Sequence, residues 1–314
     1  MIVVLTGGTG GAKLVQGLRH EVPPDDLTVI VNTGDDIDWW GLHVSPDIDS
    51  ILYALADQLS LERGWGVEND SFRCLERMKY FGQPDWFSLG DLDLATHLAR
   101  TALLRSGEPL SAVTAELAAK LGVRARVLPM SDDRVATMLD TTHGTLNFQE
   151  YFVRERHQVD VRAVRFEGAD HARPAAGVVE SIKTADAVIL APSNPVTSIG
   201  PILAVPGIRE ALRHTDAPVA AVSPIVGGNA VSGPAGLLMK RKGWPSTIAG
   251  VAQAYEDFLD LLVVDLEDHA DADHLREGGL HVLCANTIMK SLEDKQELAR
   301  FTLHAALQAR GVKS

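Results

Sequence analysis

A glycine-rich stretch, Gly7 to Lys13, directly follows the apolar run Ile2–Thr6 and constrains the fold more than any other feature of this chain. A short β-branched run that ends in glycines predicts a buried strand turning into a helix. Glycines let backbone N–H groups approach a phosphate closely, and the N-terminus of the following helix adds a favourable dipole. We therefore expect the chain to open with a phosphate-binding turn, with a purely structural tight turn as the alternative.

The stretch reads GGTGGAK and departs from two familiar phosphate-binding patterns. It is not G-x-G-x-x-G, because Lys13 stands at the last position, and it is not a Walker A loop, because Lys13 follows Ala12 and precedes Leu14. The missing third glycine and the lack of a Tyr-x-x-x-Lys pair argue against a dinucleotide-dependent oxidoreductase.

The charge of the chain limits its partners. Its 314 residues carry a net charge of −13, which disfavours nucleic acid and anionic membranes as partners. An acidic protein that handles phosphates needs backbone N–H groups and a metal. The apolar runs fall well short of the ~18 residues of a membrane span, and Cys74 and Cys284 show no metal-ligand spacing. We expect a cytoplasmic protein.

Short apolar segments alternate with helical ones, which predicts an α/β fold with a Rossmann-like, doubly wound and mainly parallel sheet. The expected strands are Ile2–Thr6, Leu27–Asn32, Asp186–Ala191, Ala217–Ser223, Leu261–Asp265 and Leu280–Ala285. The expected helices between and after them are Lys13–His20, Pro195–Ala204, Ile208–His214, Thr247–Leu259 and Leu292–Ala309.

About 150 residues separate the second and third of these strands, far more than a crossover needs. We therefore predict a nucleotide-binding core at 1–40 and 172–314 and a large inserted helical and β subdomain at 41–171. Its first half is expected to be helical, over Asp47–Leu59, Asp70–Tyr80, Asp91–Leu104 and Leu110–Leu121. Its second half is expected to be β-rich, over Ala125–Pro129, Arg134–Asp140 and Val159–Phe166.

The predicted strands end in polar, glycine-rich turns. Besides GGTGGAK these are NTGDD from Asn32, PSNP around Ser193 and Asn194, and SPIVGGNAVSG from Ser223. Because ligands of open α/β sheets lie beyond the carboxyl ends of the strands, four such turns on one edge predict a nucleotide cleft. Ser193 and Asn194 could equally be helix N-caps, a role compatible with facing a ligand.

Two paired carboxylates, Asp47 and Asp49, stand in the segment SPDID before a predicted helix. Spaced two apart in a turn, they could hold Mg²⁺, which bridges substrate phosphates. The alternative is that Asp47 or Ser45 caps the helix and Asp49 lies in its first turn. Asp35 and Asp36 are ambiguous in the same way, and His43 could orient a carboxylate.

The segment FSLGDLD also ends in a turn before a helix. Asp91 could cap that helix, and Gly90 could let a flat ligand pass close. Tryptophans in or near these loops could stack on a planar ring, although loop packing is the simpler interpretation. They are Trp39, Trp40, Trp65 and Trp86.

The motifs together, in this order, resemble the 2-phospho-L-lactate transferase family, whose members join phospholactate to the deazaflavin Fo in coenzyme F420 biosynthesis. The matching segments extend from Met1 to about Ala285 and are GGTGGAK, NTGDD, HVSPDIDSILYALAD, GWGVENDSFRCLERM, FSLGDLDLATHLAR, LPMSDDRVATML, APSNPVTSIGPIL and SPIVGGNAVSGPAG. One departure is Ser88, where the resemblance implies a basic residue in archaeal members.

The resemblance implies a Mg²⁺-dependent homodimer that takes a lactyl or enolpyruvyl group, with its phosphate, from a guanosine diphosphate-linked donor. The terminal ribityl hydroxyl of Fo attacks and GMP leaves. It implies a catalytic and metal role for Asp47 and Asp49, and Fo contacts for Asp49, Ser88, Gly90 and Asp91. Asp49 or Asp36 is a candidate base. The implied nucleotide- and phosphate-binding residues are Gly7, Gly8, Thr9, Gly10, Gly11, Lys13, Asn32, Asp35, Ser193, Asn194 and Ser198.

The alternative function is that of a regulatory protein without enzymatic activity. A related bacterial family of nucleotide-sugar-binding regulatory proteins shares the GGTGG and NTGDD loops. Its NTGDD loop continues into a glycine- and serine-rich stretch, whereas here it continues through Trp39 and Trp40 into SPDID. That continuation favours the transferase.

Overall fold

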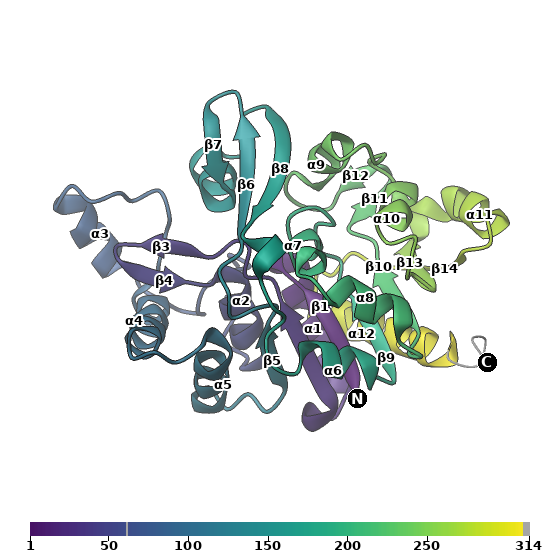
Figure 1. The fold of residues 1–314 in the computed structure, drawn as a ribbon, viewed down its shortest axis with the longest axis horizontal. Helices are drawn as coiled ribbons and strands as arrows, with labels where there is room; N and C mark the ends of the chain where they lie inside the picture. The colour runs from purple at the N-terminus through teal and green to yellow at the C-terminus, as the bar shows by residue number, and fades with distance from the viewer. Residues whose placement is uncertain (61, 310–314) are drawn as a thin grey trace.

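Seven parallel strands form the central sheet, in the order β14-β13-β10-β9-β1-β2-β5 (Figure 1). The computed structural model describes residues 1–60 and 62–309. The order confirms the predicted α/β, doubly wound, parallel sheet. The strands are β1 (Ile2–Thr6), β2 (Leu27–Val31), β5 (Arg126–Pro129), β9 (Ala187–Leu190), β10 (Val219–Val222), β13 (Leu261–Asp265) and β14 (His281–Ala285).

Both faces of this sheet are covered, which explains why its strands are apolar throughout. Along β1, Val3 and Leu5 enter one hydrophobic core and Ile2 and Val4 enter the other. Helices pack on the first face: α6 (Val178–Lys183), α7 (Ile199–Ala204), α8 (Ile208–His214), α10 (Ile248–Ala254) and α11 (His269–Glu277). Others pack on the second: α1 (Gly8–Glu21), α2 (Pro46–Leu55), α5 (Leu110–Lys120) and α12 (Leu292–Ala309).

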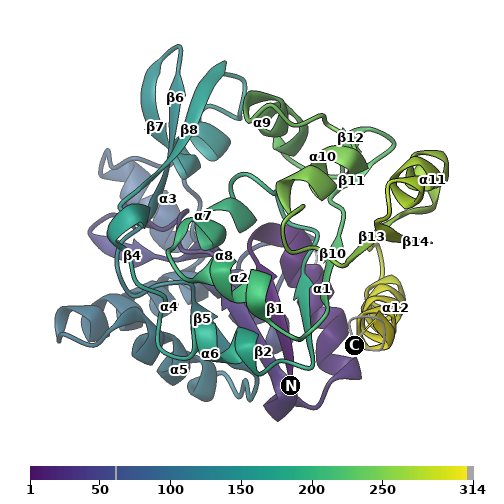
Figure 2. The ribbon, with the colours of Figure 1, turned by 45° about the vertical axis from the view of Figure 1, so that its right-hand side comes forward.

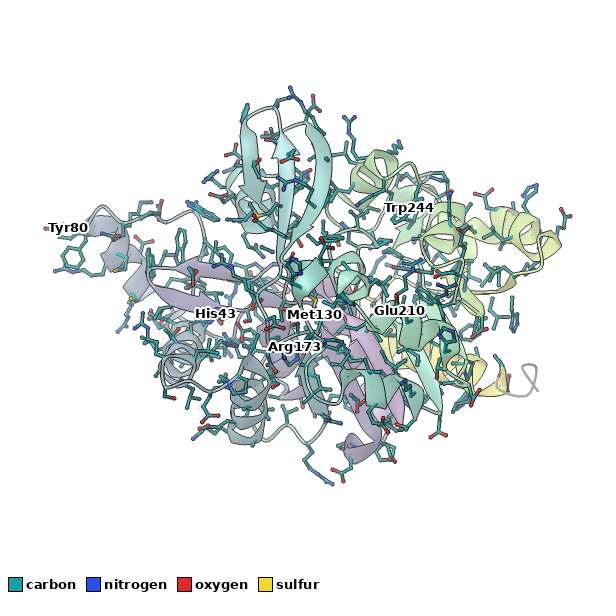
Figure 3. The ribbon with its side chains drawn as sticks, in the orientation of Figure 1. His43, Tyr80, Met130, Arg173, Glu210 and Trp244 are labelled. Carbon is teal, nitrogen blue, oxygen red and sulfur yellow. The ribbon has the colours of Figure 1, made fainter. Side chains whose placement is uncertain are left out.

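A small antiparallel sheet, in the order β7-β6-β8, projects away from the central sheet at the top of both views (Figures 1 and 2). The helix α9 (Ala235–Arg241) lies next to β8, and the hairpin of β11 (Ile225–Val226) and β12 (Asn229–Ala230) precedes it. The small sheet consists of β6 (Ala136–Thr141), β7 (Gly144–Asn147) and β8 (Val161–Glu167), with a π-helical turn at Glu150–Arg154.

A third group of elements lies at the left of Figure 1. It contains the hairpin of β3 (Ile37–Trp39) and β4 (Leu42–Val44), followed later by α3 (Arg73–Tyr80) and α4 (Asp91–Arg105). Trp39 packs edge-on against Trp86 with ring centroids 4.7 Å apart. These tryptophans therefore fill a small core of their own, as the simpler interpretation predicted. Short 3₁₀ turns occur at Pro24–Asp26, Ala169–His171 and Leu266–Asp268.

The predicted elements are present, with differences in extent. The helix expected from Pro195 begins only at Ile199, and the one expected to reach Leu259 ends at Ala254. The division into a core and a subdomain at 41–171 stays a prediction, but β5, which lies within that range, pairs with β2 in the central sheet. Among the described helices, none has the length and apolar character needed to cross a membrane.

Candidate active site

The chain reverses its direction of winding at β1, which has β2 on one side and β9 on the other. Loops after these strands meet at such a switch point and form a crevice. Here the Ser193 hydroxyl donates a 2.7 Å hydrogen bond to the Gly7 carbonyl and lies 3.3 Å from the Gly7 nitrogen. The glycine turn after β1 is thus held against the loop after β9.

Asp47 joins α2 to this glycine turn. Its carboxylate accepts a 2.7 Å hydrogen bond from the backbone N–H of Gly8 and a 2.9 Å bond from the Asn32 side chain. The Asn32 amide oxygen in turn accepts from the Gly34 N–H. The loops after β1 and β2 and the first turn of α2 therefore converge on one carboxylate, as predicted for these three motifs.

The glycines of GGTGGAK are required by close packing. A Cβ on Gly7 would lie 2.6 Å from an Asp47 oxygen, and one on Gly10 would overlap the Pro192 carbonyl. A Cβ on Gly11 would overlap the Thr6 hydroxyl. Gly8 has φ +69°, a conformation that favours glycine. These contacts account for the glycines structurally, and their binding of phosphate stays a prediction.

The remaining predicted nucleotide residues lie in different surroundings. Asn194 accepts from the Val196 N–H at 2.9 Å and so stabilises a local turn before α7. The N-cap of α7 is Ser198, so the helix cap expected at Ser193 or Asn194 is not found there. Ser198 borders Gly7 and Gly8, and Thr9 is exposed. Lys13 lies further along α1, close to Lys295. Burial of Lys295, and then the positive charge of Lys13, lower the pKa of Lys295. A role for Lys13 in the cleft stays a prediction.

Three carboxylates gather where these loops meet, those of Asp35, Asp36 and Asp47, and we call them the acidic cluster. Burial, and then the negative charge of Asp47, raise the pKa of Asp35 well above its usual range. Burial raises the pKa of Asp47 to about 6, against the hydrogen bonds from Asn32 and Gly8. Burial also raises the pKa of Asp36, although His43 and Ser45 bond to it. The cluster is short of positive charge.

A pocket of about 490 Å³ opens beside the acidic cluster. Asp35 and Asp36 line one side of it, and Ile37, Met138 and Phe148 supply apolar surface. It lies between the loop after β2 and the small β7-β6-β8 sheet. An acidic floor next to apolar walls suits a ligand with a hydrophilic and a flat apolar part.

The acidic cluster fits a divalent cation. One buried oxygen each of Asp35 and Asp36 has no hydrogen-bond partner among the described residues. Buried, mutually repelling carboxylates with free oxygens are the hard ligands that Mg²⁺ prefers. Asp47 completes the cluster, and its role as a metal ligand stays a prediction. Asp49 fits less well, because both of its oxygens already accept from the Arg100 guanidinium.

The similarity of this chain to known proteins identifies its family. The sequence model described as 2-phospho-L-lactate transferase CofD matches residues 2–292. The chain belongs to the CofD family.

Relatives carry two names. A 2-phospho-L-lactate transferase of Methanosarcina mazei is 42% identical, covering 97% of this chain and 100% of its own. A phosphoenolpyruvate transferase of Streptomyces griseus is 43% identical, covering 98% and 99%. A solved structure of a UPF0052 family protein from Bacillus halodurans shares the fold, with a TM-score of 0.65, 19% identity and coverage of 96% and 98%. The chain is thus a transferase of the CofD family.

The SLGD turn of this CofD-family protein joins two helices. Asp91, at the start of α4, accepts from the N–H of Cys74 at the start of α3, and Asp70 accepts from the N–H groups of Leu92 and Asp93. Hydrogen bonds from Ser71 and then Cys74 lower the pKa of Asp91. The prediction that Asp91 caps α4 is therefore wrong: Asp91 caps α3, and Asp70, which lies outside both helices, caps α4. Contacts of Ser88, Gly90 and Asp91 with Fo stay predictions.

Sequence reasoning missed the buried partners of Asp49. Arg100, His97 and Asp93 lie on one face of α4, and Tyr53 reaches them from α2. The signal was available, because residues 93, 97 and 100 recur at helical spacing inside FSLGDLDLATHLAR. Burial of a charged group is set by tertiary packing, so the spacing alone does not show that these side chains are buried.

Proposed function

We propose that this protein transfers a phospholactyl or phosphoenolpyruvyl group from lactyl- or enolpyruvyl-diphosphoguanosine to the ribityl hydroxyl of the deazaflavin Fo. GMP is released, and coenzyme F420-0 or its dehydro form is the product. Membership of the CofD family, with relatives of both names, supports the reaction class. The observation that carries the proposal is the meeting of the Gly7–Gly8 turn, the acidic cluster and the adjoining pocket at one edge of the sheet.

The reaction exchanges one phosphorus–oxygen bond for another. The ribityl oxygen bonds to the phosphorus nearer the lactyl or enolpyruvyl group. The bond from that phosphorus to the bridging oxygen breaks, and GMP leaves with the bond's electron pair. The hydroxyl proton passes to a base. Such a transfer depends on positioning and charge neutralisation more than on a covalent nucleophile.

The residues at the edge of the sheet suit these tasks. The first turn of α1 directs backbone N–H groups at the place where a diphosphate would lie. Asp47, with Asp35 and Asp36, would hold Mg²⁺. When bound, the ion supplies charge neutralisation for the diphosphate. Asp36 is the better placed of the two candidate bases, because it lines the pocket and has one oxygen without a hydrogen-bond partner among the described residues, whereas Asp49 is paired with Arg100.

The pocket supports an acceptor that is flat at one end and hydroxylated at the other. Ile37, Met138 and Phe148 offer apolar surface to a ring, and the Phe148 ring is itself stacked on Phe152 with centroids 5.4 Å apart. The carboxylates of Asp35 and Asp36 line the other side of the pocket, and carboxylate oxygens accept hydrogen bonds from hydroxyl groups. The deazaflavin Fo has both parts.

One assay tests the proposal. The protein is incubated with Fo and Mg²⁺ and with each donor separately, and GMP release and product mass are followed. We expect GMP to appear with Fo-dependent kinetics. The two possible products differ by two hydrogens, so mass spectrometry identifies the preferred donor. Light scattering of the same sample tests the homodimer.

The assay also separates the alternative function. Tight binding of a UDP-sugar, without GMP release from either donor, would favour a nucleotide-sugar-binding regulatory protein and contradict the proposal. The shared fold with the Bacillus halodurans protein is compatible with both, since likeness at this identity shows the fold alone.

A further inference from the structure

A buried row of charged and polar side chains connects α2 to α4 beneath the acidic cluster. Arg100 is 0% exposed, and His97 and Asp49 are 1% and 4% exposed. The Arg100 guanidinium donates to both Asp49 oxygens, and its Nη1 lies 3.1 Å from Nδ1 of His97. The opposite ring nitrogen of His97 lies 3.3 Å from an Asp93 oxygen. Asp49, Arg100, His97 and Asp93 therefore form a series of close contacts, in which the contact between His97 and Asp93 is not a hydrogen bond.

The series is anchored at its far end. The Tyr53 hydroxyl, from the last turns of α2, donates a 2.8 Å hydrogen bond to Asp93. The α2 helix thus supplies both ends of the row, Asp49 and Tyr53, while α4 supplies the three residues between them. With both ends fixed, the guanidinium has little freedom to turn.

Stability alone is a weak reason for such a row. Replacing a buried ion pair by apolar residues of similar volume is often neutral or stabilising, because burying charge is costly. Asp49, Asp93 and His97 could by their spacing surround a metal ion. Arg100 supplies the positive charge at Asp49 instead, with two parallel N–H donors that fix a carboxylate in its plane.

The row begins next to the residues of the candidate active site. Asp49 stands two residues after Asp47, whose carboxylate bonds to Gly8 and Asn32, in the first turn of α2. The positive charge of Arg100 also acts on Asp36, which lines the pocket. The guanidinium of Arg100 therefore bonds to one carboxylate of α2 and acts by its charge on a second carboxylate, in the acidic cluster.

We propose that Arg100 is a positioning residue that sets the orientation of the Asp49 carboxylate, with His97, Asp93 and Tyr53 holding the guanidinium in turn. Through this contact α4 fixes the first turn of α2, and with it Asp47, against the glycine turn. That the oriented site performs phosphoryl transfer to a hydroxyl rests on the proposed function.

Arg100→Met and Arg100→Lys test the inference, with Arg105→Met as matched control. Arg105 is an exposed arginine on the same helix and donates to the Gly41 carbonyl. We expect Arg100→Met to lower kcat about a hundredfold, the usual effect of misplacing a catalytic group by about 1 Å. Arg100→Lys, which keeps the charge but loses the paired donors, should have a kcat about tenfold above that of Arg100→Met and still about tenfold below the wild type. Arg105→Met should match the wild type.

The stoichiometry of GDP binding separates positioning from folding. If Arg100 only stabilised the fold, its replacement would reduce the number of GDP-binding sites per chain and the kcat in the same proportion. Positioning predicts full GDP stoichiometry, measured by calorimetry with Mg²⁺, beside the lowered kcat. If Arg100→Met fails to fold, Arg100→Lys carries the same comparison. Wild-type kcat in Arg100→Lys, or a loss matched by lost GDP sites, would overturn the inference.

A double variant tests whether Arg100 acts through Asp49. In an Asp49→Asn background the guanidinium no longer has a carboxylate to orient, so adding Arg100→Met should cause no further loss of kcat. A further loss as large as in the wild-type background would overturn the inference. A wild-type protein that releases no GMP from either donor would instead contradict the proposed function, so the two failures are distinguishable.

Discussion

The backbone N–H of Gly8 donates a 2.7 Å hydrogen bond to the carboxylate of Asp47. In a phosphate-binding turn, the N–H groups at this position face the phosphate. An acidic side chain of the protein therefore occupies, in this structure, the place where an anionic ligand would bind. A phosphate bound at this turn would compete with the carboxylate for the same donor unless a cation bound both, so this hydrogen bond is one reason for the Mg²⁺ requirement that we propose.

Asp47→Asn should separate the two roles of this carboxylate. Removing the charge removes repulsion of the diphosphate, so we expect GDP to bind about tenfold more tightly in EDTA than it binds to the wild type, about 1.4 kcal/mol. Turnover with Mg²⁺ should fall at least about tenfold, because a cation ligand is lost. Calorimetry and GMP release measure the two effects.

Asp57→Asn is the control for Asp47→Asn. Asp57 follows α2, is exposed, pairs with Arg19 and has φ +57°, which asparagine also tolerates. It should leave both measurements unchanged. Weaker metal-free GDP binding by Asp47→Asn would contradict the view that Asp47 competes with the ligand.

Stability of the metal-free protein should fall as pH rises from 5 to 7.5. Burial raises the pKa of Asp47 to about 6 in the folded protein, above its usual value of 3.8. A raised carboxyl pKa means that folding favours the protonated form, so stability is lost as pH rises from the unfolded pKa through the folded one. Asp47 alone contributes a loss on the order of 1 kcal/mol over this interval, and Asp35 acts in the same direction.

Urea unfolding in EDTA at the two pH values measures this difference, and Asp47→Asn should diminish it. Mg²⁺ should diminish it too, because a cation stabilises the ionised carboxylates. Stability that rises from pH 5 to 7.5 in EDTA would show that the acidic cluster stays ionised when folded and free of metal.

Removal of the metal should abolish turnover reversibly. Asp35, Asp36 and Asp47 bring negative charge to the place where a diphosphate would lie, and the nearby Arg100 is already paired with Asp49. We expect EDTA to stop GMP release and excess Mg²⁺ to restore it, with circular dichroism unchanged throughout. Undiminished turnover in the chelator would reject the metal role.

The core strands and long helices were predictable because each is encoded by its own periodicity. The ends of β13 and α12 agree with the predicted Leu261–Asp265 and Leu292–Ala309 to the residue. The position of β5 in the sheet was not predictable, because any short apolar strand can pair at either edge. The partners of that strand are decided by the packing of α2 and α5 on the same face.

The candidate site, too, was predictable from the sequence only in part. Sequence motifs brought Gly8, Asn32 and Asp47 together correctly, since each directly follows or precedes a core element. They did not reveal that Asp49 would pair with Arg100, because that contact joins residues 51 positions apart through the packing of two helices. A sequence pattern places a side chain on a helix, strand or loop, and tertiary packing decides which charged group it contacts.

Gly90→Ala should weaken the junction between α3 and α4. A Cβ at this position would overlap the Asp70 carboxylate, which caps α4 through the N–H groups of Leu92 and Asp93. Loss of a cap costs about 1 to 2 kcal/mol, so we expect the free energy of unfolding to fall by that amount in urea. Gly278→Ala is the control, since its Cβ would have its nearest neighbour at 3.3 Å, the Leu275 carbonyl oxygen. If Gly90→Ala keeps wild-type stability but loses affinity for Fo, the glycine is there for the ligand and the capping explanation is wrong.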